Sequence, residues 1–385
     1  MNPSLEIAWS APVTDLDDGR DTADPLGFRG WANQLACDLV PGLTQVTWRT
    51  RGYSLLCNGL LLAQKFEQNR DINPVEAFLR FERLWVGAQR AVHGKGARWA
   101  GVRMADVLLA NDTYRLDKPL TSQQLYSGIW GGYRRSATAL GLIRPSGRRS
   151  GPSGYELTKL GKDMASAVAK NGFSAKSRLA EHILKPSLPV DVLRSLILEQ
   201  PPGQEPSLPE VDLLSTAIRA TDRLQDNALQ CLRSAFDRCK RRPLELVTLA
   251  KEKELSDVQR RAAVAASELL SLMLAIEAPY RLWVTGSSVK PIPQTIWRHP
   301  GWETIRRWPV PELVSLHDTM CSPPKGATVF ETIHQHHERL MESRGAEPWE
   351  RDIDTPARRD YQAPDFCLQS ASLLFAEGVL QGKHS

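Results

Sequence analysis

The histidines that could do chemistry gather in one short stretch near the C-terminus. His334, His336 and His337 lie within four residues of one another, and Glu338 follows them. On a helix, His334 shares a face with His337 and with Glu338, and imidazole and carboxylate groups are ligands that zinc accepts. The sequence thus offers His334, His337 and Glu338 as metal ligands. However, the stretch does not match HExxH, a further ligand would have to come from elsewhere, and a polar helix surface explains it more simply. We therefore expect no metal and no other cofactor.

Two acidic stretches supply the carboxylates that a magnesium-dependent nuclease would need, at positions 17–18 (Asp-Asp) and 252–254 (Glu-Lys-Glu). Such an enzyme holds its metal between carboxylates that adjacent strands keep together. Residues 252–254 fall in a helical pattern and residues 17–18 in a polar leader, so nuclease chemistry is disfavoured. Cys231 and Cys239, eight residues apart on a helical pattern, are better explained as packing residues than as nucleophiles.

Other catalytic signatures are missing from the sequence. It contains no GxxxxGK[ST] phosphate-binding loop, no GxGxxG after a strand, and no GxSxG in which a serine nucleophile would sit. The pair Gly147 and Gly151 encloses Arg149 instead of a serine. The sequence therefore favours a non-enzymatic protein over an enzyme.

Positive charge is concentrated in one part of the chain. With 49 Lys and Arg against 44 Asp and Glu, the 385 residues carry a net charge of only +5. Residues 119–155 contain no acid, and residues 119–180 contain ten Lys and Arg against two acids, a net +8 that leaves −3 for the rest. Clustered cations without interleaved acids suit a polyanion, because each neutralised phosphate releases counterions. A solvated basic surface without a ligand is the alternative.

The elements that must position these residues are mostly helices, so we predict a mostly α protein. Helical periodicity marks residues 26–40, 51–68, 74–92, 210–240, 244–276, 327–343 and 365–380. We divide the chain into a polar leader (1–24), a helical module (25–104), a basic module (105–200), a Pro-rich linker (201–209) and a helical C-terminal domain (210–385) with a Trp- and Pro-rich segment (282–310). No apolar run approaches the roughly 18–20 residues of a membrane span, and six cysteines without a CxxC pair are typical of a cytoplasmic protein.

Within the basic module the expected order is helix, hairpin, helix. Apolar residues recur at helical spacing from position 125 to 140, and Gly141 is placed to end that helix. Two short apolar stretches flank the turn-rich PSGRRSGPSG and predict a β-hairpin. Thr158 then precedes a last helix, over residues 159–170, as its N-cap.

This order, with Leu-Gly-Leu-Ile before the hairpin and Leu-Thr-x-x-Gly after it, resembles a winged helix-turn-helix domain over about residues 105–172. The resemblance implies that the helix before the hairpin enters the major groove of DNA and that the hairpin contacts the backbone or the minor groove. Tyr133 is also explained as a core residue, since it shares the spacing of the apolar positions. Carried onto this sequence, the residues expected to contact DNA are Tyr133, Arg134, Arg135, Arg144, Arg148, Arg149, Lys159 and Lys162.

A wider similarity concerns the opening segment ADPLGFRGWANQLACDLVPGLTQVTWRTRGYSLLCNGL and the late pairs His-His and Pro-Trp. Together with the winged helix, they resemble uncharacterised proteins of bacterial genome-defence loci. The resemblance implies a DNA-directed defence component, such as an anti-phage protein. The C-terminal half, with its Trp- and Pro-rich segment, is expected to dock a protein partner in a multi-subunit complex. We therefore expect a cytoplasmic subunit that binds double-stranded DNA and no membrane. The alternatives are a protein-docking scaffold without DNA contact and, less favoured, a metal-dependent enzyme or nuclease.

Overall fold

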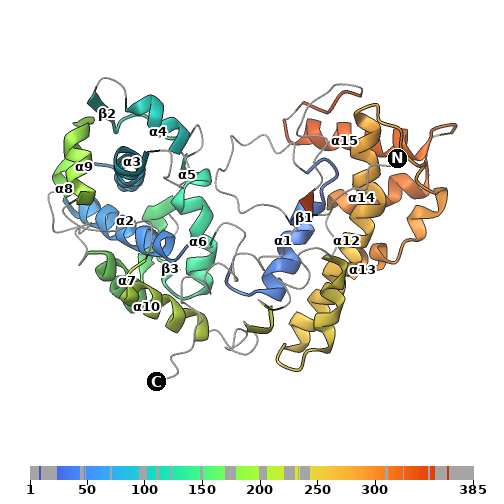
Figure 1. Cartoon of the computed structure of the whole chain (residues 1–385), viewed down its shortest axis with the longest axis horizontal. Coiled ribbons are helices and arrows are strands. Elements are labelled where there is room, and N and C mark those ends of the chain that lie inside the picture. The colour runs from blue at the N-terminus through green and yellow to red at the C-terminus, as the bar shows by residue number, and fades with distance from the viewer. Residues whose placement is uncertain are drawn as a thin grey trace. The chain divides into compact units, whose positions relative to one another are not determined.

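The computed structural model is mostly helical and divides into two compact units (Figure 1). It describes residues 8–9, 24–43, 47, 49–69, 72–94, 102–109, 112–121, 124–147, 151–169, 179–198, 206–220, 230–232, 234, 243–307, 311–323, 325–345, 347–351 and 362–363. The described part of unit 1 comprises 8–9, 24–40 and 230–363, and that of unit 2 comprises 41–220. The predicted leader, linker and last helix (365–380) lie wholly or largely outside the described residues.

Unit 2 is built around the paired helices α2 (Thr50–Asn69) and α3 (Pro74–His93). Helix α3 begins where the sequence predicts, because the Asn73 side chain accepts a hydrogen bond from the Val75 N–H (2.9 Å) and Pro74 occupies the first turn. Its face towards α2 buries Phe78 and Phe81. The surrounding helices are α4 (Val102–Leu108), α5 (Gln124–Ser127), α6 (Ile129–Ala139), α7 (Lys159–Ala169), α8 (Leu179–Leu184), α9 (Val190–Leu198) and α10 (Leu208–Arg219).

Strands are few and short in the described residues, in agreement with the predicted mostly α class. In unit 2, β3 (Ile143–Pro145) and β4 (Tyr155–Leu157) form the predicted antiparallel hairpin, joined through the 3-10 helix η3 (Gly151–Gly154). Strand β2 (Thr113–Arg115) pairs antiparallel with β5 (Ser187–Pro189). In unit 1, β1 (Ala8–Trp9) pairs parallel with β6 (Gln362–Ala363).

Unit 1 is centred on the long helix α12 (Asp257–Val284), which α1 (Phe28–Leu39) packs against. The Gln259 side chain donates a hydrogen bond to the Leu39 carbonyl (3.1 Å). Residues 25–104, which we grouped as one helical module, are therefore divided between the two units. The rest of unit 1 consists of the 3-10 helices η4 (Pro243–Lys251) and η5 (Gln294–Arg298) and of α13 (Gly301–Arg307), α14 (Pro311–Cys321) and α15 (Val329–Ser343).

Two predicted helices are interrupted in the structure. The helix expected over 244–276 is instead η4, a turn at residues 252–256, and α12. A capping box starts α12 anew, because the side chains of Ser256 and Gln259 each bond the other residue's backbone N–H. The helix expected from the apolar pattern over 125–140 breaks at Gly128 into α5 and α6, since the Glu82 carboxylate accepts the Ile129 N–H there (2.7 Å). A Cβ on Gly128 would lie 2.3 Å from that carboxylate.

Helix α12 is also the one described helix that is long and apolar enough to cross a membrane. Most of its apolar stretch is buried within unit 1, where it packs against α1, η4 and α13. Core helices of folded proteins share this length and composition, and the burial of α12 within unit 1 is that of a core helix.

Candidate nucleic-acid interface

Helix α6, which precedes the hairpin, presents one face to the core of unit 2. Trp130 and Tyr133 are buried on this face, with 2% and 7% of their surface exposed. The Tyr133 ring lies against Gly52 of α2, where a Cβ would come within 2.1 Å of it, and meets Tyr53 edge-on at 5.1 Å. The structure therefore places Tyr133 in the core and not on the surface that DNA would reach.

The opposite face of α6 carries two adjacent arginines. Arg134 and Arg135 are exposed, because they point away from the row that includes Tyr133 and Ala137. The Arg134 guanidinium lies 5.7 Å from the centre of the Trp130 ring, a cation–π contact that leaves its N–H groups at the surface. Both side chains can thus reach a ligand that lies along α6.

The hairpin adds a third exposed arginine, but an acid accompanies it. Arg144 on β3 is directly opposite Glu156 on β4, and its Nε donates to a Glu156 carboxylate oxygen (2.5 Å). The Arg144 side chain is 68% exposed, so this surface pair contributes little to stability and exchanges easily for another anion. Arg148 and Arg149, expected at the hairpin tip, lie outside the described residues.

The first turn of α7 supplies Lys159 and Lys162, both exposed, and it is tied to the end of α6. The Thr158 hydroxyl donates to the Gly141 carbonyl (2.7 Å) and accepts from the Gly161 N–H (3.1 Å), which confirms the predicted N-cap. The Thr158 N–H donates to the Leu142 carbonyl (3.1 Å). We call the five exposed cations of α6, the hairpin and α7 the basic surface: Arg134, Arg135, Arg144, Lys159 and Lys162.

These contacts explain the Leu-Thr-x-x-Gly motif. At Gly161, a Cβ would lie 2.0 Å from the Leu142 carbonyl oxygen, closer than any side chain allows. The threonine therefore caps α7, and the glycine lets the helix approach the turn that follows α6. The motif holds the two lysines of α7 in a fixed relation to α6.

A buried polar network holds the other end of α6. Glu82 on α3 accepts the Ile129 N–H and the Gln124 side-chain N–H (3.0 Å), and burial raises the pKa of its carboxyl to about 7. Arg83 donates to the Gln124 side-chain oxygen (2.9 Å) and to the Leu116 carbonyl (2.7 Å). This network was not anticipated from the sequence, and the one available signal was the adjacent charged pair Glu82 and Arg83 inside the run FLRFERLW.

The histidines of α15 form a core cluster and not an open metal site. The His337 Nδ1–H donates to the Pro25 carbonyl (2.8 Å) and its Nε2 accepts the Trp349 N–H (2.8 Å), so neither nitrogen has a lone pair for a metal. His334 bonds the Tyr280 hydroxyl through Nδ1 (2.9 Å), and its Nε2 lies 3.8 Å from Glu338. Burial lowers the pKa of His334, which favours the neutral ring. His334, His337 and Glu338 therefore cannot all bind one metal ion in this arrangement, because both nitrogens of His337 are already hydrogen-bonded.

Comparison with known proteins yields no relative for this chain. It matches no protein-family model, no curated protein and no solved structure.

Proposed function

We propose that this chain is a non-enzymatic subunit that binds double-stranded DNA through the basic surface of unit 2. The observation that carries the proposal is the exposure of all five described cations around α6, the hairpin and α7. The acids in residues 119–180 are only Glu156 and Asp163. Of these two acids, Glu156 pairs with Arg144 and Asp163 is exposed beside Lys162, so five cations face two carboxylates and the surplus can neutralise phosphates.

The arrangement of elements supports a winged helix-turn-helix as the binding module. Helix α6 is followed directly by the β3–β4 hairpin and then by α7, which packs on the hairpin and on α2. In this proposal the exposed face of α6, with Arg134 and Arg135, enters the major groove and the hairpin lies along the backbone. Strand β2 pairs with β5 and not with the hairpin, so the wing has two strands.

The number of exposed cations sets the expected salt dependence. Each phosphate contact contributes about −0.9 to the slope of log K against log salt, so five contacts give a slope of about −4.5. Arg144 contributes to this slope only if its guanidinium leaves Glu156 and binds a phosphate. A slope of only about −2 would leave the two arginines of α6 alone in contact with DNA.

The test is fluorescence anisotropy of a labelled random-sequence duplex titrated with the full chain at rising salt. The variant R134E/R135E reverses two charges on α6, and we expect its affinity to fall at least about tenfold at low salt. The matched control is R306E/R307E, because those two adjacent arginines are exposed on α13 in unit 1. If both variants lose the same affinity, the loss reflects only the change in net charge, and the proposal is contradicted. An affinity that does not change with salt concentration contradicts it as well.

The cellular setting rests on the resemblance to proteins of bacterial genome-defence loci. A subunit of an anti-phage assembly would act in the cytoplasm, where the DNA is, together with protein partners. The resemblance supports this setting through the opening segment of the chain, and the DNA titration tests only the binding step.

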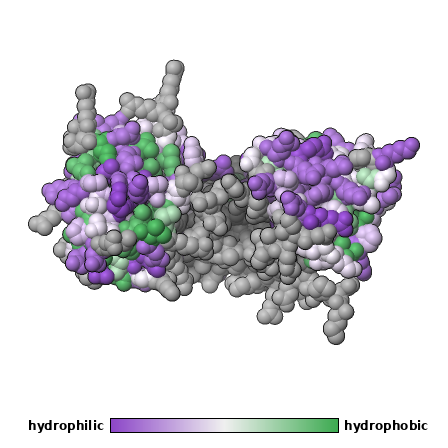
Figure 2. Space-filling model, turned by 90° about the horizontal axis from the view of Figure 1, so that it is seen from above, coloured by the Kyte–Doolittle hydropathy of each residue, from purple (hydrophilic) through white to green (hydrophobic). Residues whose placement is uncertain are grey.

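A protein-docking scaffold without DNA contact is the second candidate. Several apolar side chains of unit 2 stay at the surface, among them Val107 (67% exposed) and Leu208 (79% exposed). Figure 2 shows hydrophobic residues interspersed with hydrophilic ones on one face of this unit. A partner that co-purifies with the full chain and is lost in V107D or L208D, with no affinity for duplex DNA, would favour the scaffold.

A further inference from the structure

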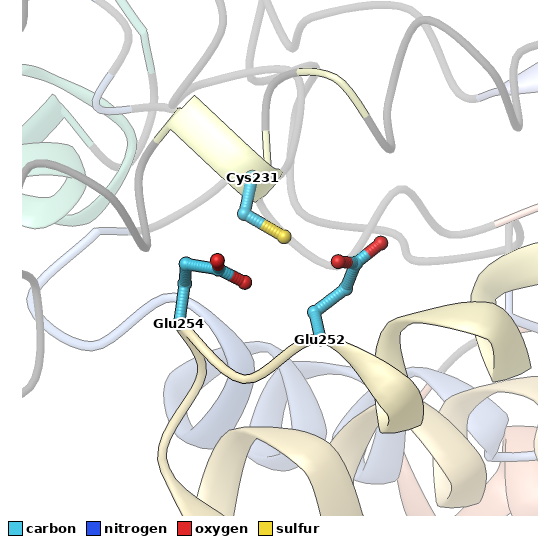
Figure 3. A group of neighbouring side chains, drawn as sticks. All are labelled: Cys231, Glu252 and Glu254. Atoms are coloured by element: carbon cyan, nitrogen blue, oxygen red, sulfur yellow. The ribbon is translucent and has the colours of Figure 1, made fainter.

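A thiol and two carboxylates converge in unit 1 at residues that the DNA-binding proposal does not use. The Sγ of Cys231 and one carboxylate oxygen each of Glu252 and Glu254 all lie within 4.8 Å of one another. Figure 3 shows the three side chains pointing into one space, the cysteine from a short helical segment and the glutamates from the chain between η4 and α12. The ligands thus come from segments about twenty residues apart in the sequence.

The turn at residues 252–256 is what brings the two glutamates together. On a continuous helix, Glu252 and Glu254, two positions apart, would face different directions. The end of η4 and the capping box of α12 replace that helix with a turn. Arg260 holds the turn, since its guanidinium donates to the carbonyls of Glu252 (3.3 Å) and Leu255 (2.5 Å).

The ligand set indicates which kind of cation fits. Magnesium and calcium take oxygen ligands almost alone, whereas zinc accepts thiolate and carboxylate in one site. Ligand atoms about 2.0–2.3 Å from a tetrahedral metal lie about 3.5 Å from one another, so small side-chain rotations close the observed separations. Cys231 and Glu252 are half-buried and Glu254 is exposed, which leaves a path for the ion.

We propose that Cys231, Glu252 and Glu254 bind a zinc-type divalent cation, with water in the fourth position. The cation is attracted by the two carboxylates and by the thiolate that forms when it binds. Binding requires the thiolate, so the Cys231 thiol gives its proton to the solvent as the metal–sulfur bond forms. The site is independent of the basic surface, and its loss leaves DNA binding unchanged.

The experiment is a titration of the full chain with Co²⁺, after chelator treatment and under a reductant that does not bind metal. Cobalt replaces zinc in such sites, and a thiolate ligand gives a sulfur-to-cobalt charge-transfer band in the near ultraviolet. We expect this band in the unmodified chain, its disappearance when Zn²⁺ is added, and its persistence in excess Mg²⁺. A missing band, or displacement of cobalt by Mg²⁺, overturns the proposal.

Variants separate this site from the other described thiols. C231S should abolish the band, while E254Q should keep it and weaken binding at least about tenfold, since losing even a supporting contact costs that much. The matched control is C321S, because Cys321 is an exposed thiol whose Sγ lies 3.5 Å from the His317 Nε2. A band that survives C231S or vanishes in C321S assigns the metal to another place and refutes the proposal. Circular dichroism checks that each variant is folded, and E254Q, at an exposed side chain, keeps the test valid if C231S fails to fold.

Discussion

Gly161→Ala is the substitution that tests the geometry of the basic surface most directly. Gly161 lies in the first turn of α7, and its Cα faces the turn that follows α6. A Cβ there would sit 2.0 Å from the Leu142 carbonyl oxygen. That oxygen also accepts the Thr158 N–H and the Thr158 hydroxyl, so it cannot move away without disturbing the residue that caps α7.

Two opposing effects decide the sign of the change in stability. On an open helix surface, alanine in place of glycine stabilises by up to about 1 kcal/mol, because it restricts the unfolded chain. An added methyl group in a closely packed place costs about 1–3 kcal/mol, and here the obstacle is backbone instead of a flexible side chain. Loss of the Thr158 cap adds about 1 kcal/mol. We therefore expect G161A to lower the free energy of unfolding by about 1–3 kcal/mol.

Urea denaturation followed by circular dichroism measures this change. Ser166 is exposed on the same helix, where its hydroxyl donates to the Lys162 carbonyl (2.8 Å). S166A and S166G both lack this bond, so the difference between them calibrates what glycine costs relative to alanine at an exposed position, about 1 kcal/mol. A destabilised G161A should also bind duplex DNA more weakly, because the lysines of α7 lose their fixed relation to α6. If G161A is as stable as the unmodified chain or more so, the close approach is absent and this account of the motif is refuted.

Three further predictions concern buried groups. Glu82→Gln should flatten the pH dependence of stability. Because the pKa of Glu82 is raised to about 7, the folded chain keeps a proton that the unfolded chain releases above about pH 4.5. In the unmodified chain the free energy of unfolding therefore falls by at most about 3 kcal/mol as the pH rises towards 7. Urea midpoints at about pH 5 and about pH 8 measure the slope, and an unchanged slope in the variant contradicts the assignment. His337→Phe should destabilise the chain by about 2–4 kcal/mol in thermal or urea denaturation, because the Pro25 carbonyl and the Trp349 N–H lose their partner in a buried place; a neutral effect would mean that water replaces the ring. Tyr133→Phe should leave the anisotropy-measured DNA affinity unchanged, since the ring lies in the core, and a clear loss of affinity would show that the hydroxyl reaches DNA.

Local signals in the sequence determined the elements whose ends depend on neighbouring residues. Asn73 and Pro74 begin α3 because a side-chain acceptor and a fixed φ act within the first turn. The Gly/Ser/Pro-rich tip predicts the hairpin, and Thr158 predicts the start of α7. Gly141, with φ of +68°, follows the last turn of α6, at the position where the sequence predicts that the helix ends. Each of these signals lies within about ten consecutive residues, so they can be recognised without the rest of the fold.

The tertiary structure decided which face of each helix is buried and which distant groups meet. Periodicity shows that Tyr133 and His337 lie on helical faces, but it does not show that those faces are buried. Tyr133 is a core residue because α2 packs against it, and His337 is one because it contacts Pro25. Glu82 interrupts a helix 47 positions away, and no local pattern encodes that contact. The thiol of Cys231 meets its two carboxylates for the same reason. Side chains separated by long stretches of chain come together only when the whole core forms, because burial is a property of the packed unit and not of the segment.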